Sequence, residues 1–360
     1  MAYITGTNGN DSLNVSGGYT GTDSWGALDN GSKSDNTLNG GAGNDTLSAS
    51  GSFGKNLLLG GNGNDYLDIS GGYILAFPGE YYNDSAEGNN TLCGGAGNDT
   101  LSAKGSLGNN ILSGGDGNDY LDISGSELKH EITNNQLASI INNISQGDNT
   151  LYGGAGNDTL SASGSTGNNL LNGGDGNDYI SISGYYKGNQ YDYSNSRSSG
   201  KNTLNGGAGN DILSASGSTG NNILNGDAGN DVLIATNSTG NNILNGGAGN
   251  DSLYGGLGTN TFVFNGYNEG VDSLYNFHPA KDRIQVSAHD FGGGLSTPSL
   301  AQDQFAIGTS ATTSNQRFIY NDITGALFFD QDGSAHGFSQ VKFAQLSAGL
   351  SLTQNNFVVV

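Results

Sequence analysis

One short pattern with a fixed phase constrains the fold of this chain more than any other feature. The pattern is Gly-Gly-x-Gly-Asn-Asp with a leucine or isoleucine two residues after the Asp, and copies of it run from Gly40 to Leu253. Its glycines allow left-handed backbone dihedrals, so the chain turns sharply and its carbonyl groups can converge beside the carboxylate. We call this unit the Asp turn. Its aspartates are Asp11, Asp45, Asp65, Asp99, Asp119, Asp158, Asp178, Asp211, Asp231 and Asp251.

The spacing of the Asp turns predicts a solenoid with two different sides. Successive aspartates are 34, 20, 34, 20, 39, 20, 33, 20 and 20 residues apart. The 20-residue form contains a second, weaker turn, such as Gly217-Ser218-Thr219-Gly220-Asn221-Asn222, and two short strands. Coils that stack about 4.8 Å apart would align the aspartates in one column. The weaker turns, which we call Asn turns, would align an opposite column of Asn36, Asn56, Asn90, Asn110, Asn149, Asn169, Asn202, Asn222 and Asn242, and we expect these amides to form stacked hydrogen-bond ladders.

A thin apolar core accompanies the turns. Leucine or isoleucine follows each Asp or Asn by two positions, as at Leu47 and Leu58. We call a coil short when the next Asp turn follows after 20 residues and long when it follows after 33–39 residues. Two positions after the leucine or isoleucine, short coils carry alanine and long coils carry valine or isoleucine. Because packing at native density couples neighbouring volumes, this agreement favours a packed solenoid over a flexible glycine-rich linker. The positions are Ala49, Ala103, Ala162, Ala215 and Ala235 in short coils and Val15, Ile69, Ile123 and Ile182 in long coils.

Charge and composition restrict the partners. The chain has a net charge of -22 with only 11 Lys and Arg, so it should repel nucleic acids and anionic lipid surfaces and attract cations.

A single cysteine, Cys93, excludes an internal disulfide framework and a thiolate metal cluster. The N-terminal residues lack the basic start and apolar run of a signal peptide, and no apolar stretch is long enough to span a bilayer.

The long coils carry inserts near 17–34, 72–88, 126–147 and 185–200, all on one side of the solenoid. Three are rich in aromatic residues, and the insert at 126–147 has Leu137, Ile140, Ile141 and Ile144 at helical spacing, which predicts a short helix. The aromatic residues could cover the solenoid or bind a glycan, and the candidates for glycan binding are Tyr81, Tyr82, Tyr185 and Tyr186.

Residues 1–260 therefore form one predicted domain, and 261–360 form a second, β-rich cap. Apolar residues alternate in Phe262-Val263-Phe264, Arg283-Ile284-Gln285-Val286, Arg317-Phe318-Ile319-Tyr320 and Ala326-Leu327-Phe328-Phe329, which indicates antiparallel strands. Such a segment would close the open end of the solenoid, as the terminal units of repeat proteins do.

The repeated turn resembles the RTX (repeats-in-toxin) nonapeptide repeat, a calcium-binding solenoid pattern. The segment from Gly255 through Val271-Asp272-Ser273-Leu274 to Arg283-Ile284 is similar to the C-terminal part of serralysin-type RTX proteins, with Asn276 where that family commonly has Asp. The resemblance implies an all-β parallel β-roll, calcium between stacked turns, and an extracellular or cell-surface location. It also implies export by a type I system that reads the carboxyl end, here Asn356-Phe357-Val358-Val359-Val360, without a cleaved leader.

The predicted metal sites lie between successive Asp turns, with up to one Ca²⁺ in each of the nine gaps between ten turns. Oxygen atoms of carboxylates and carbonyls are the ligands that calcium prefers. Two carboxylates about 5 Å apart repel by roughly 3 kcal/mol at an effective dielectric of 20, so we expect the coils to stack only when calcium is bound. The predicted ligands, besides the ten aspartates, are Gly41, Gly43, Gly61, Gly63, Gly95, Gly97, Gly115, Gly117, Gly154, Gly156, Gly174, Gly176, Gly207, Gly209, Gly229, Gly247 and Gly249.

We expect no enzymatic activity. His130-Glu131-Ile132-Thr133-Asn134 lacks the second histidine of a zinc-protease helix, and no Gly-x-Ser-x-Gly elbow occurs. The leading interpretation is a secreted calcium-binding β-roll of the cell surface or extracellular matrix. The alternatives are a calcium-dependent adhesin or lectin-like module that binds glycans through its inserts, and a homo-oligomer or filament that assembles when calcium is present.

Overall fold

A computed structural model of the chain describes residues 2–15, 34–71, 73–77, 80–83, 86–133, 136–143, 145–189 and 192–360, and in the segments 73–83, 126–143 and 185–196 it describes the backbone alone. The chain divides into two compact units. One comprises Met1–Thr203 and Gly217–Gly220, and the other Leu204–Ser216 and Asn221–Val360. In the described residues no helix is long and apolar enough to cross a membrane.

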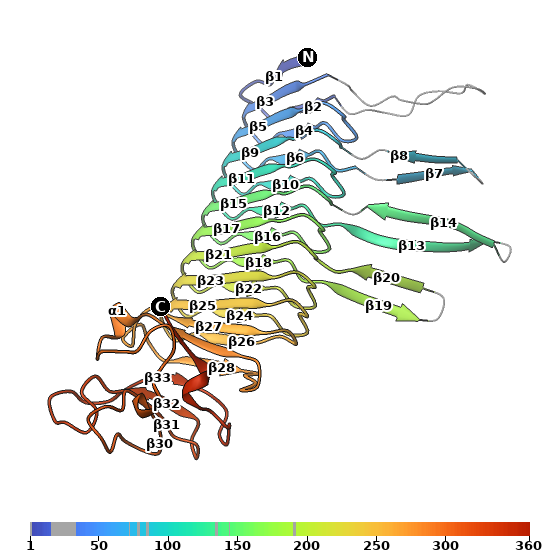
Figure 1. The fold of residues 1–360 in the computed structure, drawn as a ribbon. Coiled ribbons are helices and arrows are strands. Elements are labelled where there is room, and N and C mark those ends of the chain that lie inside the picture. The colour runs from blue at the N-terminus through green and yellow to red at the C-terminus, as the bar shows by residue number, and fades with distance from the viewer. Residues whose placement is uncertain are drawn as a thin grey trace. The chain divides into compact units, whose positions relative to one another are not determined.

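Each coil of the first unit contributes one strand to each of two parallel sheets (Figure 1). The first sheet contains β1 (Ala2–Thr5), β3 (Asn36–Ala42), β5 (Asn56–Asn62), β9 (Thr91–Ala96), β11 (Ile111–Asp116), β15 (Thr150–Ala155) and β17 (Leu170–Asp175). The second contains β2 (Ser12–Asn14), β4 (Thr46–Ser48), β6 (Tyr66–Asp68), β10 (Thr100–Ser102), β12 (Tyr120–Asp122), β16 (Thr159–Ser161) and β18 (Tyr179–Ser181). The predicted all-β parallel β-roll is confirmed.

The core lies between the two sheets and follows the predicted leucine rows. Leu47 pairs with Leu67 in the second sheet and Leu38 with Leu58 in the first, and all four side chains are fully buried. The alanines of the short coils and the isoleucines of the long coils are fully buried as well, Ala49 and Ile69 among them. Each coil thus adds a few small apolar side chains to a core only one layer thick.

The three described inserts of the first unit leave the roll on one side, between a second-sheet strand and the next first-sheet strand (Figure 1). They form antiparallel hairpins, and the fourth insert, near 17–34, lies almost wholly outside the described residues. The helix predicted in 126–147 is wrong, because this segment pairs as β13 with β14. The hairpins are β7 (Tyr73–Phe77) with β8 (Glu80–Asn83), β13 (Ser126–Thr133) with β14 (Gln136–Asn143), and β19 (Tyr185–Asn189) with β20 (Asp192–Ser196).

The second unit also has two sheets. One contains β21 (Asn202–Ala208), β23 (Asn222–Ala228), β25 (Asn242–Ala248), β27 (Asn260–Phe264), β29 (Arg283–Val286) and β34 (Phe357–Val359). The other contains β22 (Ile212–Ser214), β24 (Val232–Ile234), β26 (Ser252–Tyr254), β28 (Asp272–Tyr275), β33 (Val341–Gln345), β32 (Ala326–Phe329), β31 (Phe318–Tyr320) and β30 (Phe305–Ile307). Its described helices are α1 (Ala288–Phe291) and the 3-10 turns Gln302–Gln304 and Gln354–Asn356.

All four C-terminal segments predicted as strands are strands, but only part of this region is antiparallel. β27 and β29 pair in parallel with β25 and with each other, so they continue the roll. The antiparallel pairs are β31 with β32 and β32 with β33. The boundary predicted at 260/261 remains a prediction.

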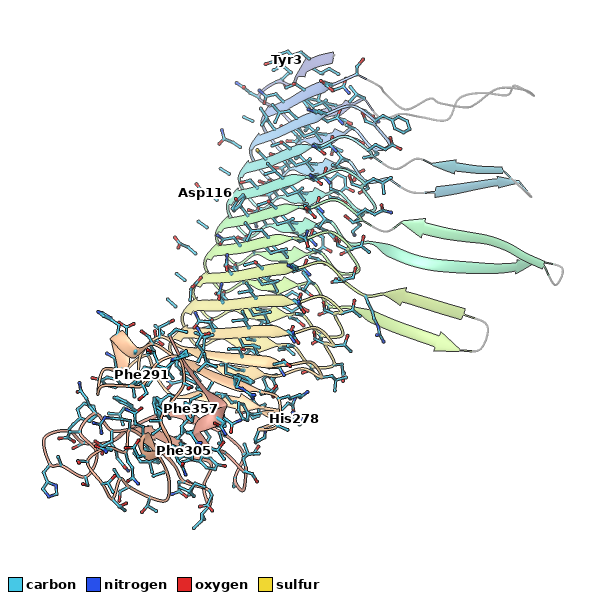
Figure 2. All side chains as sticks on the ribbon, viewed as in Figure 1. Tyr3, Asp116, His278, Phe291, Phe305 and Phe357 are labelled. Carbon is cyan, nitrogen blue, oxygen red and sulfur yellow. The ribbon has the colours of Figure 1, made fainter. Side chains whose placement is uncertain are left out.

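Aromatic side chains replace the leucine rows in the C-terminal part of the second unit. Phe291 packs edge-on against Phe329 at 5.0 Å and Phe343 at 5.4 Å, measured between ring centroids. Phe357 lies 4.8 Å from Phe318. Figure 2 labels Phe291, Phe305 and Phe357 in this region. Large buried rings give this end of the chain a thicker core than a coil has.

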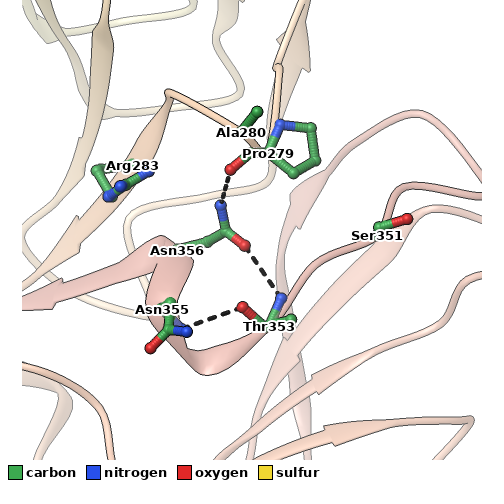
Figure 3. Close-up of a pocket in the computed structure, with 7 residues that line it drawn as sticks. All are labelled: Pro279, Ala280, Arg283, Ser351, Thr353, Asn355 and Asn356. Carbon is green, nitrogen blue, oxygen red and sulfur yellow. Dashed lines mark hydrogen bonds between the residues drawn. The ribbon is translucent and has the colours of Figure 1, made fainter.

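The carboxyl end, which resembles an export signal, is folded into this unit. β34 pairs in parallel with β29, and Phe357 and Val359 are buried. Asn356 donates from Nδ2 to the Pro279 carbonyl at 2.8 Å and accepts from the Thr353 N–H at 3.0 Å (Figure 3). These residues border a pocket of about 410 Å³, lined by Pro279, Ala280, Arg283, Ser351, Thr353, Asn355 and Asn356.

Candidate calcium sites

The glycines of the Asp turn have the backbone geometry that the sequence predicted. The glycines at the second and fourth positions of the turns from Gly40 onward have φ between 92° and 145°, a region that residues with a side chain rarely adopt. A Cβ placed on Gly61 or Gly63 would overlap the carbonyl oxygen of Gly41 or Gly43 in the preceding coil. These carbonyl groups therefore point from one Asp turn toward the next.

The aspartates of each unit form a buried column. The Oδ1 atom of each carboxylate accepts a hydrogen bond from the backbone N–H of the aspartate in the preceding coil, for example Asp65 N–H to Asp99 Oδ1 at 2.7 Å and Asp99 N–H to Asp119 Oδ1 at 2.8 Å. The side chains from Asp45 to Asp251 are only 1–3% exposed. One oxygen of each carboxylate is thus used to hold two coils in register.

The second carboxylate oxygen has a different environment. Seven aspartates have a buried Oδ2 atom that accepts no hydrogen bond from the residues that the structure describes: Asp45, Asp65, Asp99, Asp119, Asp158, Asp231 and Asp251. A Cβ placed on Gly94 would overlap Asp99 Oδ2 and lie 2.7 Å from the Gly114 carbonyl oxygen of the next coil. A carboxylate oxygen and a carbonyl oxygen therefore converge where only glycine leaves room, and neither can donate a hydrogen bond to the other.

Burial changes the acidity of these carboxylates. It raises the pKa of Asp65 and Asp99 to about 6 and that of Asp158 and Asp231 to about 7, and carboxylates stacked above and below add to the increase. The backbone N–H bonds to the carboxylates act in the opposite direction but are outweighed by burial. A column of this kind is stable when the buried Oδ2 atoms that lack a hydrogen-bond donor receive a proton or a cation.

The Asn turns form the predicted amide ladder. Asn110 donates from Nδ2 to Asn149 Oδ1 at 3.0 Å, and Asn90 donates in the same way to Asn110 Oδ1 at 3.0 Å. Asn110 Nδ2 also donates to the Gly108 carbonyl at 2.8 Å and to Ser106 Oγ at 3.0 Å. The hydrogen-bonding groups of these neutral amides are therefore satisfied within the protein, as the sequence indicated.

The donor set of the Asp turns fits Ca²⁺. It consists of carboxylate and carbonyl oxygens on adjacent coils, which are hard ligands, and in the seven aspartates named above one buried oxygen has no hydrogen-bond partner among the described residues. Among the described residues no three His, Cys, Asp or Glu side chains converge as a metal cluster. Backbone carbonyls would therefore supply much of the coordination, as the glycine pattern predicted. The assignment of these residues as ligands remains a prediction.

Two positions differ from the sequence prediction. In Asp11 the Oδ2 atom is not left without a partner, because it accepts hydrogen bonds from the Thr7 backbone N–H and from Thr7 Oγ1. Thr7 stands where the other turns have their second glycine. Asp272, which the prediction omitted, extends the column, since its Oδ1 accepts from the Asp251 N–H at 3.1 Å. Burial raises the pKa of Asp272 to about 8. The signal that could have found it is Gly270-Val271-Asp272-Ser273-Leu274, with leucine two residues after the Asp.

The candidate glycan-binding tyrosines have not been placed as side chains. Tyr81 and Tyr82 lie in β8, and Tyr185 and Tyr186 lie in β19, hairpin strands of which only the backbone is described. Their role stays a prediction.

Comparison with known proteins identifies the repeat. The RTX calcium-binding nonapeptide repeat matches residues 30–51, 48–73, 85–101, 102–122, 145–164, 161–181, 214–237 and 236–266. No curated protein matches the chain. Among solved structures, the extracellular lipase LipA from Serratia marcescens is similar over 77% of this chain, with 19% identity and a TM-score of 0.27. The match spans 45% of the lipase, less than half of its length. From the repeat matches, the all-β roll and the columns of Asp turns, we conclude that this chain carries RTX calcium-binding nonapeptide repeats, which build its roll.

Proposed function

We propose that this protein is a secreted calcium-binding β-roll that folds when extracellular Ca²⁺ fills its Asp turns. One observation carries the proposal: seven buried aspartates each retain an oxygen atom to which no group in the described part of the chain donates a hydrogen bond. At neutral pH, stacking such carboxylates without a counter-ion is unfavourable because each is desolvated and repelled by its neighbours. A divalent cation between coils removes both costs, so folding and binding are one event.

The calcium concentration would then decide where the protein folds. Extracellular calcium modules bind with dissociation constants of about 0.1–1 mM, far above the calcium level of a cytoplasm. The chain would stay largely unfolded before export and fold outside the cell.

After folding, the roll acts as a binding component of the cell surface or extracellular matrix and not as an enzyme. The sequence contains neither His-Glu-x-x-His nor Gly-x-Ser-x-Gly. The length of the roll suits this role, since stacked coils present extended flat faces to the surroundings.

A calcium titration of the full chain tests the proposal. Far-ultraviolet circular dichroism should show a cooperative gain of β structure as calcium rises into the millimolar range, and a chelator should reverse it. Sedimentation measured in parallel should give an unchanged mass. A spectrum that is the same with calcium and with chelator would overturn calcium-dependent folding, and growth in mass during folding would point to calcium-triggered assembly instead.

A further inference from the structure

The outer surface of the second sheet carries a regular row of tyrosines in the first unit. Strand pairing places Thr46, Tyr66, Thr100, Tyr120, Thr159 and Tyr179 in register, so threonine and tyrosine alternate along six successive coils. The tyrosines are 45%, 41% and 46% exposed in the order Tyr66, Tyr120 and Tyr179. We call these six residues the Tyr–Thr row. Roughly half of each tyrosine side chain therefore faces solvent.

The second unit shows what tyrosines do on adjacent strands. Tyr254 of β26 and Tyr275 of β28 pair directly, and their rings stack at 4.4 Å with 11° between planes. Each of these rings covers the other. In the Tyr–Thr row a threonine strand separates the tyrosines, so successive tyrosines are about 10 Å apart along the sheet. That spacing is close to two stacking distances, which leaves space over each threonine for one further ring.

Fixed polar groups border the row. Tyr120 donates from its hydroxyl to Asp122 Oδ2 at 2.9 Å, and Lys104 Nζ lies 2.8 Å from the same oxygen. Asp68 takes the corresponding place beside Tyr66 and accepts from Ser50 Oγ. The neighbouring positions Ser102 and Ser161 bond to Ser70 and Ser124 at 2.7 and 2.8 Å. Hydroxyl and carboxylate groups thus line the row and hold at least one ring in place.

We propose that the Tyr–Thr row binds an extended neutral polysaccharide, with successive pyranose rings seated on and between the tyrosines. A pyranose has an apolar C–H face, which packs on an aromatic ring, and a rim of hydroxyls, which can hydrogen-bond to the tyrosine hydroxyls and donate to the carboxylate of Asp68. Asp122 is buried and paired with Lys104, so it holds the ring of Tyr120 in place and does not face the ligand. The net charge of -22 repels anionic polymers, which favours a neutral one. The same charge disfavours a second copy of the chain as the occupant. This surface needs the folded roll, so the inference rests on the proposed function.

The test uses the full, calcium-loaded chain and its retention on insoluble cellulose, with cellohexaose as the soluble competitor. Replacing Tyr66, Tyr120 and Tyr179 together by alanine should reduce retention at least tenfold, and replacing them by phenylalanine should preserve most of it. Thr100→Tyr should also reduce retention, because three adjacent tyrosines would then stack on one another as Tyr254 and Tyr275 do. Tyr254→Ala is the matched control and should leave retention unchanged.

Circular dichroism of each variant with calcium separates loss of the surface from loss of the fold. Equal retention of the native chain and the folded triple alanine variant would overturn the inference, as would failure of the folded native chain to bind cellulose. A concentration-dependent increase in mass that the alanine substitutions abolish would also overturn it, by assigning the row to an interface between copies. If the chain binds cellulose but its spectrum does not respond to calcium, calcium-dependent folding is refuted, while polysaccharide binding by the Tyr–Thr row is retained.

Discussion

The two ends of each coil use nearly the same side chain with opposite results. Asp99 and Asn110 both accept a backbone N–H from the preceding coil through Oδ1, at 2.7 and 3.3 Å. They differ in the second atom of the side chain. Asn110 Nδ2 lies within hydrogen-bonding distance of three oxygen acceptors for its two N–H groups, whereas none of the described residues donates to Asp99 Oδ2. One atom decides whether the protein's own groups satisfy the side chain, as at Asn110, or leave a buried oxygen without a donor, as at Asp99.

The surrounding turn matches each side chain. Ser106, fully buried in the Asn turn, accepts from Asn110 and donates to the Ala86 carbonyl at 3.0 Å. In the Asp turn the equivalent residue is Gly95, whose φ of 118° directs carbonyl oxygens toward the next coil. Serine satisfies the polar groups of the Asn-turn edge with hydrogen bonds, whereas glycine leaves the Asp-turn edge lined with acceptor oxygens. The comparison teaches that the calcium edge is defined by missing donors as much as by its carboxylates.

Exchanging the two side chains should produce the largest effect. Asn110→Asp replaces an amide NH2 group, which lies near three oxygen acceptors, by a charged acceptor that would face the same oxygens. We expect the free energy of unfolding in saturating calcium to fall by about 3 kcal/mol or more, measured by urea denaturation.

The reverse exchange, Asp99→Asn, is the matched variant. It should keep the coil register but lose the ions on both sides of its coil, counted by atomic absorption after dialysis. Asn110→Asp should not lower that count. An unchanged ion count in Asp99→Asn would contradict the assignment of the Asp turns as the calcium edge.

A methyl group in the space beside Asp99 should have a smaller but clear effect. The Cβ of Gly94→Ala would overlap Asp99 Oδ2 and crowd the Gly114 carbonyl, so the coils must separate locally. We expect a loss of about 1–3 kcal/mol and a higher calcium concentration at half folding, measured by circular dichroism. Gly9→Ala is the control, since its Cβ would meet nothing closer than Thr7 Oγ1 at 3.8 Å. Equal behaviour of the two variants would contradict the proposed geometry.

The pH dependence should be the smallest effect and should change sign with calcium. Carboxyls whose pKa is raised in the folded state bind protons more tightly when folded, so their contribution is full below about 4 and is lost as pH rises through about 6 for Asp65 and Asp99 and about 7 for Asp158 and Asp231. The chelated chain should therefore gain β structure as pH falls from about 8 to about 5. The calcium-loaded chain should instead lose ions over this range. A chelated chain that gains structure on raising the pH would refute the sign.

The sequence predicted the roll well because its repeat is strict. The phase of Asp and Leu placed the residues of both columns and the core, and the buried Leu rows and the amide ladder follow directly from it. The insert at 126–147 was predicted wrongly because the spacing of its isoleucines suits a helix. A hairpin such as β13 with β14 instead returns the chain to its starting edge, where the next coil begins one strand spacing away.

The sequence by itself determined the repeat, the identity of the two columns and the choice of calcium, since these depend on local backbone freedom and on residue type at a fixed period. Only the tertiary structure decided which carboxylate oxygens lack a partner, that Thr7 satisfies Asp11, that Asp272 continues the column, and that the tyrosines of alternate coils form one row. These features depend on contacts between residues 20 or more positions apart, or on the exact direction of a side chain within a turn. Periodicity places such residues on the same edge, but stacking the coils determines which atoms meet.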